Sequence, residues 1–374
     1  MQIEKLAASV AATLVLAACG GGSGGGGSAL LPDSSQQAGG GTGTQDAVTT
    51  PATTQHVAMI TALPGPPGGM QLWSLNDNGH AAGIATTGSF PMSVSTQNYH
   101  IANADNFYQG NGTAFPTTVA GNNNSGVIAG LASPAGERPF AYTWDGASLT
   151  RITQAGDRLK VFFVAGIDDS NRLATTITDL DGANHQAAVY ADGSYSSFPR
   201  VGRNGETSNA LAISYNGKLV ASLRDAVTNE IYLGVWDFPN GQIQSIRKFL
   251  TYDWTGCRCV VKRVTNQGDI LLMSGSSPGG ATWPMIVNAS ESIALPSAVN
   301  STTMDMNDAR QVVGGVAGKP VFWDNGTLND LNAYAESSKL GWKFITAERI
   351  NNNHQVLGRG TYNGQERWYL MTLR

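Results

Sequence analysis

One short pattern recurs seven times along this chain and constrains its fold more than any other feature. Each copy has an apolar residue, two or three Asn- or Asp-like residues, a turn position, and a short apolar stretch that often ends in Gly or Ala. The turn positions fall at residues 79, 126, 171, 217, 268, 310 and 354. A spacing of about 45 residues with β-type composition is typical of propeller blades. The repeat therefore predicts an all-β fold, a seven-bladed β-propeller.

The polar residues of each copy indicate tight hairpin turns. Such turns need residues that tolerate positive φ, and Asn, Asp and Gly tolerate it best. A ring of calcium-binding carboxylates and carboxamides is an alternative, but the complete D-x-D-x-D-G spacing never occurs, and Asp179-Leu180-Asp181-Gly182 comes nearest. The five histidines do not lie at metal-ligand spacing, and His80 and His354 fall at the hairpin turns, where we expect exposed side chains. We therefore predict that the polar residues of each copy form turns and that they hold no metal ion.

An apolar strand that often ends in an aromatic residue follows each copy, before another Asp/Asn/Gly turn. Trp144, Trp236 and Trp323 occupy equivalent places in three of these strands. Tryptophan at such a place favours packing between neighbouring blades over stacking on a cofactor. We expect no cofactor.

The N-terminal part of the repeat region is predicted to close the ring. Several blades contain an apolar residue followed by Pro at the end of their last strand, as in Phe198-Pro199 and Leu295-Pro296, but the seventh copy ends without one. The stretch from Val57 to Leu63 precedes Pro64 and supplies the missing strand. We expect it to be the outer strand of the seventh blade, because closure removes sheet edges that would otherwise aggregate. The propeller domain is then residues 55–374.

The repeats are similar to a known family. The copies at 306–314 and 350–358 match best the core "IN-x-x-G-x-VVG" of the HAF-type extracellular repeat, whose "F-L-W-x-x-G" continuation follows the copies. The resemblance covers nearly everything from about residue 55 to the C-terminus. The third and fourth copies depart from it, with Asn171 in place of Gly and Ser214-Tyr215 in place of the Asn pair. The resemblance implies a secreted β-propeller and no established chemistry.

The N-terminus has the form of an export signal. Lys5 precedes an apolar stretch that ends Leu16-Ala17-Ala18-Cys19, too short for a spanning helix. This ending resembles a bacterial lipobox, which implies cleavage after residue 18 and a lipid on Cys19, and Gly20 favours the outer membrane. Residues 19–54 are rich in Gly, Ser and Thr, and we expect a flexible tether that spans roughly 30–35 Å. The predicted partner of the N-terminus is therefore the membrane.

Charge and cysteine content narrow the function. The net charge is −4, so nothing indicates a nucleic-acid partner. Cys257 and Cys259 are separated by one residue and lie on the extracytoplasmic side if the chain is exported. They can form a strained local disulfide or stay inert thiols, and the alternatives are a redox handle or a soft-metal site.

A long connection from Lys248 to Lys262 contains the candidate ligand-binding residues Tyr252, Asp253 and Trp254. An aromatic ring next to a carboxylate suits a sugar ring or a peptide side chain, and Trp254 lies outside the repeating aromatic place. Three functions stay open: a tethered binding or scaffolding module for a glycan or envelope protein, an extracytoplasmic polysaccharide lyase or hydrolase, and a structural partner in envelope assembly. The first is favoured because no catalytic residue pattern is visible, and catalytic residues stay unknown.

Overall fold

The computed structural model describes residues 59–374 except 87–89, 103–116, 135–136, 153–158, 183, 199–206, 225–226, 229–230, 240, 249–259, 276–281, 297–303, 317 and 335–339. The predicted signal, Cys19 and the predicted tether lie outside the described residues.

Seven antiparallel sheets form the fold, and six of them are built from four consecutive strands. Blades 1 to 3 contain β2 (Met70–Leu75), β3 (Ala81–Ala85), β4 (Phe90–Val94), β5 (Tyr99–Ile101), β6 (Thr117–Asn122), β7 (Ile128–Ala132), β8 (Phe140–Trp144), β9 (Leu149–Ile152), β10 (Leu159–Ile167), β11 (Leu173–Asp179), β12 (His185–Ala191) and β13 (Ser194–Ser197). Blades 4 to 6 contain β14 (Thr207–Ile213), β15 (Lys218–Arg224), β16 (Ile231–Asp237), β17 (Gln242–Lys248), β18 (Val260–Val264), β19 (Ile270–Gly275), β20 (Thr282–Val287), β21 (Ser292–Ala294), β22 (Asp305–Met306), β23 (Val312–Val316), β24 (Lys319–Asp324) and β25 (Thr327–Asp330). The described helical structure is one 3₁₀ turn, η2 (Leu331–Ala333).

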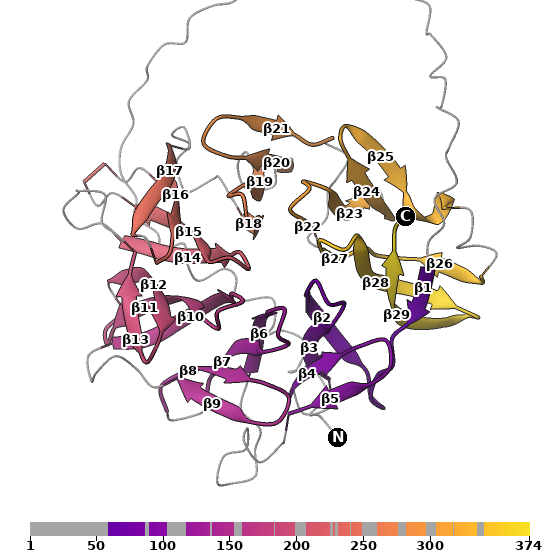
Figure 1. Ribbon diagram of the computed structural model, residues 1–374, viewed down its shortest axis with the longest axis horizontal. Helices are drawn as coiled ribbons and strands as arrows, with labels where there is room; N and C mark the ends of the chain where they lie inside the picture. Colours follow the sequence, from indigo (N-terminus) through magenta and orange to yellow (C-terminus); the bar gives the residue numbers. More distant parts are fainter. Residues whose placement is uncertain are drawn as a thin grey trace, which may run out of the picture.

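The sheets stand around a common axis, as Figure 1 shows, and in blades 1 to 6 the first strand lies nearest to it. The predicted seven-bladed β-propeller is confirmed. We call the face that carries the turns between the first and second strands of the blades the lower face. The opposite face, where second strands lead into third strands and one blade leads to the next, is the upper face. Each inner strand therefore runs from the upper face to the lower face.

The seventh blade joins the two ends of the described chain. The strands β26 (Trp342–Phe344) and β27 (Arg349–Ile350) both pair with β28 (Gln355–Tyr362), which pairs with β29 (Gln365–Thr372). The outer strand is β1 (Met59–Ala62), antiparallel to β29 with Met59 opposite Thr372 and Ala62 opposite Tyr369. Leu63 extends this pairing through a backbone hydrogen bond to Trp368 (2.9 Å). The N-terminal stretch thus closes the ring, as the repeat pattern predicts.

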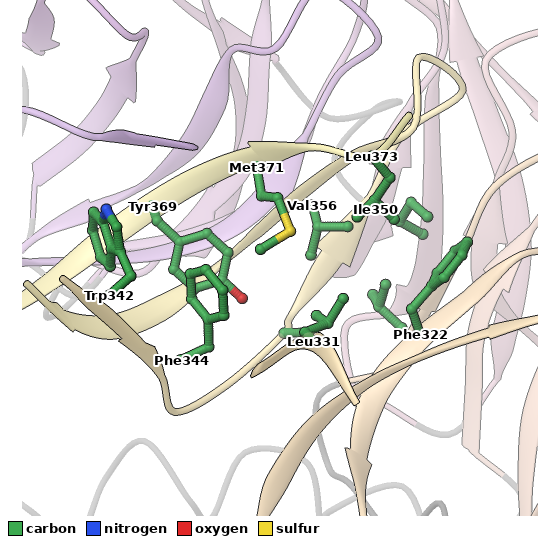
Figure 2. Close-up of a cluster of buried hydrophobic side chains, with 11 residues drawn as sticks. Phe322, Leu331, Trp342, Phe344, Ile350, Val356, Tyr369, Met371 and Leu373 are labelled. Carbon is green, nitrogen blue, oxygen red and sulfur yellow. The ribbon is translucent and has the colours of Figure 1, made fainter. Parts of the chain in front are cut away.

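The core of the protein consists of seven hydrophobic clusters, and each lies between two neighbouring blades. Figure 2 shows the cluster between blades 6 and 7, where Phe322 and Leu331 face Phe344, Tyr369 and Met371. This arrangement follows from the geometry of a propeller, because both faces of each blade must be covered by a neighbour.

The equivalent tryptophans are part of these clusters. Trp144 lies between blades 1 and 2, Trp236 between blades 3 and 4, and Trp323 between blades 5 and 6, and all three are buried. The prediction that they pack between blades is confirmed.

All seven predicted turn positions adopt positive φ: Gly79 (77°), Gly126 (86°), Asn171 (60°), Gly217 (93°), Gly268 (94°), Arg310 (61°) and His354 (55°). In every copy the backbone N–H of the turn residue donates a hydrogen bond to the backbone carbonyl of the residue three positions earlier, at 3.0–3.2 Å. The repeat thus marks one hairpin per blade. His80 and His354 are exposed at these turns, as expected.

A glycine in the second strand allows a tyrosine to cross it in two blades. The Tyr142 hydroxyl on β8 donates to the carbonyl of Thr118 on β6 (2.9 Å), and it passes over Gly130 of β7. A Cβ at Gly130 would lie 1.9 Å from that carbonyl oxygen. Blade 7 repeats the arrangement with Tyr369, whose hydroxyl donates to Thr346 (2.7 Å) over Gly358. Glycine is therefore required at positions 130 and 358, where the copies of the repeat in blades 2 and 7 end in glycine.

Candidate functional site

The lower face is tied together by side chains from the hairpin turns. The side-chain amide of Asn76 donates to the backbone carbonyl of Asn123 in the next blade (2.7 Å), and the side-chain amide of Asn123 donates to the backbone carbonyl of Asp168 (3.0 Å). Asn351 of blade 7 donates to the carbonyl of Asn76 (2.8 Å), so the pattern continues across the point where the ring closes. These bonds satisfy buried backbone carbonyls and fix each blade against its neighbour.

The next residue of each turn forms a second ring, which we call the polar belt. Its members are Asp77, Asn124, Asp169, Tyr215, Asn266, Asp308 and Asn352. The N–H of Asp77 donates to Asn124 Oδ1 (2.8 Å), and the N–H of Asn124 donates to Asp169 Oδ1 (2.9 Å). Asn352 closes the belt by donating from its N–H to Asp77 Oδ1 (2.9 Å).

Carboxylates and carboxamides are interleaved in the polar belt. Asn352 donates from its side chain to both Asp77 (3.1 Å) and Asp308 (3.0 Å), so an amide separates two like charges. Such bonds to carboxylates are charge-assisted and stabilise the ring. Among the described residues, no group of three or more His, Cys, Asp or Glu side chains could hold a metal ion. The belt residues act as turn formers and as links between blades.

Tyr215 is the one belt member that is neither Asn nor Asp, and its side chain crosses the axis. Its hydroxyl donates to the carbonyl of Leu75 in blade 1 (2.9 Å), and the residue is buried. Burial raises the pKa of Tyr215 above its usual value, so the phenol stays protonated and donates.

Arg263 of β18 lies against this tyrosine. Its guanidinium carbon is 4.9 Å from the Tyr215 ring centroid, and its Nε is 3.9 Å from a carboxylate oxygen of the buried Asp305. Burial disfavours the Arg263 cation, but the neighbouring Tyr215 and Asp305 outweigh that effect and hold its pKa above the ordinary value. Tyr215, Arg263 and Asp305 together occupy the axis near the lower face, and we call them the axial plug.

Two more cations lie on the inner strands. Lys262 of β18 precedes Arg263, and Arg349 of β27 belongs to blade 7; both are partly buried. The Arg349 Nε donates to the carbonyl of Trp73 in blade 1, and its Nη1 donates to the carbonyl of Glu348 (2.6 Å). Burial, and to a lesser extent the charge of Arg349, lowers the pKa of the Lys262 ammonium below its ordinary value.

The upper half of the ring exposes apolar side chains. Phe162 and Phe163 on β10 are 40% and 47% exposed, and the Phe162 ring is 4.6 Å from that of His185 on β12. The His185 Nδ1 lies 3.0 Å from Asn209 Oδ1 of the next blade. Aromatic rings beside imidazole and carboxamide groups can bind sugar rings or peptide side chains.

The predicted ligand-binding residues Tyr252, Asp253 and Trp254 lie outside the described residues, and so do Cys257 and Cys259. The strand before them, β17, ends at Lys248, and the strand after them, β18, begins at Val260. Both of these ends are at the upper face, because each connection between successive blades begins and ends there. These five residues stay candidates from the sequence.

The sequence interpretation missed Lys262 and Arg349. It treated Tyr215 only as a departure from the repeat, although that departure marks the residue that crosses the axis. Lys262 and Trp73 stand three positions before the first turn residue of their blades, where other blades have Ala120 or Leu211. An alignment of the copies over these earlier positions would have singled out the two residues.

No helix within the described ranges combines the length and the apolar character needed to cross a membrane. No family model and no curated protein matches the chain, so the likeness to HAF-type repeats stays a resemblance.

Solved structures similar to the chain include a streptogramin B lyase, with 10% identity and a TM-score of 0.47 over 85% of this chain and 98% of the other. They also include virginiamycin B lyase from Staphylococcus aureus, with 11% identity and a TM-score of 0.47 over 85% of this chain and 100% of the other. A third, YCF48 bound to D1 peptide, has 10% identity and a TM-score of 0.47 over 86% of this chain and 98% of the other. Similarities at this level of identity and TM-score carry no information about the ligand or the activity of this chain.

Proposed function

We propose that this protein is a membrane-tethered extracytoplasmic binding propeller, and that its ligand, a glycan or an envelope protein, docks on the upper face. The observation that carries the proposal is the placement of exposed large apolar side chains. Ten are found in the described part of the chain, and eight lie at the upper face or on strands near it: Ile101, Phe162, Phe163, Leu180, Val227, Val260, Leu340 and Ile345. They come from blades 1, 3, 4, 5 and 7, and a face that exposes more large apolar side chains than the opposite face is favoured for an interaction.

The position of β1 supports a binding role for the upper face. Met59, the first described residue, pairs with Thr372 at the lower end of β29. A tether that precedes Met59 therefore leaves from the lower face. The upper face is then the one farther from the point of attachment, where a ligand has access. Lipid attachment at Cys19 and placement in the outer membrane are parts of this proposal.

The closed ring gives this face a rigid support. β1 closes the seventh blade, the polar belt links the blades at the lower face, and the clusters between blades fix their spacing. A preorganised surface loses little conformational freedom when a ligand binds, which favours affinity. We include Tyr252, Asp253 and Trp254 in the proposed binding face because the strands on both sides of them end there.

The test is a binding screen of the full chain in detergent against purified glycans and purified envelope proteins. Phe163→Ala, on the upper half of the ring, should weaken binding by about tenfold, the effect of losing one well-placed aromatic contact. Leu328→Ala, which removes an exposed apolar side chain near the lower face (37% exposed), is the matched control and should have no effect. Trp254→Ala tests the sequence candidate separately.

Three outcomes would contradict the proposal. Binding lost in Leu328→Ala but kept in Phe163→Ala would place the ligand on the lower face. Shortened products after incubation with a polysaccharide would favour the lyase or hydrolase. No binding to any member of the screen would favour a structural role in envelope assembly.

A further inference from the structure

The inner strand of blade 3, β10, has an irregularity that β2, β6, β14 and β18 lack. In each of those four strands the register against the second strand shifts once, three positions before the first turn residue of the blade. β10 shares that shift, at Ala165, and has a second one at Phe162. Bulges of this kind redirect side chains and are frequent beside active sites.

The second shift turns two adjacent phenylalanines toward blade 4. Val161 and Val164 both pack in the cluster between blades 2 and 3, although they are three residues apart. The residues between them, Phe162 and Phe163, therefore lie on the other side of the blade. Phe163 pairs with Thr176, whose hydroxyl accepts a hydrogen bond from a backbone N–H of blade 4 (3.0 Å), in agreement with this orientation. The two phenylalanines are 40% and 47% exposed, so blade 4 leaves much of both rings open to solvent.

A pair of polar side chains adjoins these rings. The Phe162 ring centroid is 4.6 Å from that of His185 on β12. The His185 Nδ1 is 3.0 Å from Oδ1 of Asn209 on β14, the inner strand of blade 4. Both polar side chains are half-buried, and within the described ranges neither has another hydrogen-bond or ion-pair partner. The contact between them orders both groups and leaves each with capacity for a ligand.

The pair offers a ligand one donor and one acceptor. With the carboxamide oxygen toward the neutral imidazole, Nδ1 carries the proton, so His185 Nε2 accepts and the Asn209 amino group donates. If the carboxamide turns over, the two roles exchange and the pair still presents one of each. Neighbouring hydroxyls of a sugar match such a pair, because each hydroxyl both donates and accepts.

Two charged groups near the upper end of the blade are engaged with backbone groups. Lys160 on β10 donates to the carbonyl of Leu180 (3.1 Å), and Asp179 accepts from the N–H of Asn184 (3.1 Å). A site built from aromatic rings and neutral polar groups favours an uncharged ligand over an ionic one.

We propose that Phe162, Phe163, His185 and Asn209 form a subsite for a neutral pyranose ring of a glycan, between blades 3 and 4. The CH face of the pyranose stacks on the phenylalanines, and two neighbouring hydroxyls bond to the polar pair. This inference rests on the proposed function and names the ligand class of its upper face. His185 is the first residue of β12, a strand that begins at that face.

The experiment is isothermal titration calorimetry of the full chain in detergent with four neutral tetrasaccharides, built from glucose, galactose, mannose or N-acetylglucosamine. At least one of them should bind. Phe162→Ala should weaken its binding about tenfold, the effect of losing one well-placed aromatic contact. His185→Phe keeps an aromatic ring, and Asn209→Leu keeps the size of the side chain. Each should weaken binding about three- to tenfold, the effect of losing one hydrogen bond between neutral groups.

His80→Phe is the matched control for His185→Phe, because His80 is an exposed imidazole at the lower face. This variant should bind the tetrasaccharide as the unmodified chain does. If Asn209→Leu does not fold, Phe162→Ala and His185→Phe still decide the question. Phe162 is exposed, and a phenylalanine at position 185 retains a ring beside it.

Binding of none of the four tetrasaccharides, or unchanged binding in either Phe162→Ala or His185→Phe, overturns the subsite. Binding of an envelope protein that is lost in His185→Phe, with no sugar bound, overturns the assignment to a sugar. The two proposals fail in different ways. A ligand lost in Phe163→Ala but unaffected by His185→Phe and Asn209→Leu leaves the upper-face function and removes the subsite. A ligand lost in Leu328→Ala but kept in Phe163→Ala removes both.

Discussion

The Tyr215 hydroxyl, in the turn between β14 and β15, donates a hydrogen bond to the carbonyl of Leu75 on β2 (2.9 Å), which joins blade 4 to blade 1 across the axis of the ring. Among the described residues, the hydrogen bonds of the other belt side chains run to adjacent blades. Tyr215 adds a link across the axis, while blade 4 keeps its links to its neighbours: the Asp169 N–H donates to the Tyr215 carbonyl (2.9 Å), and the Asn216 N–H donates to Asn266 Oδ1 (3.0 Å).

Tyr215→Phe should lower the free energy of unfolding by about 0.5–1.5 kcal/mol, because it removes one buried hydrogen bond and keeps the ring. Chemical denaturation measures the change. Tyr362→Phe is the control, since Tyr362 stacks on Trp342 (5.0 Å) and its hydroxyl makes no hydrogen bond to the described residues. Equal stability of Tyr215→Phe and the unmodified chain would show that the bond across the axis is not stabilising.

Removal of the chain through Leu63 should open the ring. β29 then loses its outer partner and becomes an exposed edge strand, and the cluster between blades 6 and 7 loses Ile60 and Ala62. We expect a lower unfolding temperature and self-association that increases with concentration, because unpaired edges bind one another. Light scattering after size exclusion measures this, with removal of residues 1–54 as the control. A monomer of unchanged melting temperature would contradict the role of β1.

Gly130→Ala should destabilise the protein by about 1–3 kcal/mol or more, the usual effect of overpacking. The new methyl group would lie 1.9 Å from the Thr118 carbonyl and 2.5 Å from the Tyr142 hydroxyl. Gly121→Ala in the neighbouring strand is the control, because its Cβ would meet only Ser74 Oγ at 3.7 Å. Thermal unfolding of both variants measures the difference. Similar melting temperatures would mean that β7 can shift away from Tyr142.

Asp168 should make stability depend on pH in an unusual direction. Its side chain is fully buried, and this burial raises its pKa above the ordinary value although Arg172 donates to it at 2.6 Å. The folded protein therefore holds this proton more tightly than the unfolded chain does. The carboxyl contributes a penalty that grows as pH rises from the unfolded pKa, about 3.9, and is complete above the raised folded pKa.

Asp168→Asn removes this titration, and Asn123 shows that an amide fits the same place in blade 2. The unmodified chain should lose stability relative to Asp168→Asn as pH rises through that window. Urea unfolding midpoints between pH 3 and 7 measure the difference. A relative gain of the unmodified chain with rising pH would contradict the raised pKa.

The repeat determined most of the fold. Seven turn positions were enough to number the blades, because positive φ selects Gly, Asn and a few others locally. The missing last strand and the stretch ending at Leu63 were enough to place β1. The equivalent tryptophans fell between blades because a repeat of this kind can bury aromatic rings only against its neighbours.

The site was much less predictable. Tyr215, Lys262 and Arg349 come from blades 4, 5 and 7, and only closure of the ring brings them around one axis. Arg349 reaches Trp73 across 276 residues of sequence, which no local pattern indicates. Phe163 resembles any apolar strand residue, and its exposure depends on how the upper ends of the blades meet.

The most direct test of the account is hydrogen–deuterium exchange of the full chain with and without the ligand that binds most tightly in the screen. The account predicts slower exchange at the upper ends of β10, β18 and β26, and no change at the hairpin turns that carry the polar belt. Protection confined to those turns, around Asp77 and Asp308, would place the ligand on the lower face and contradict the account.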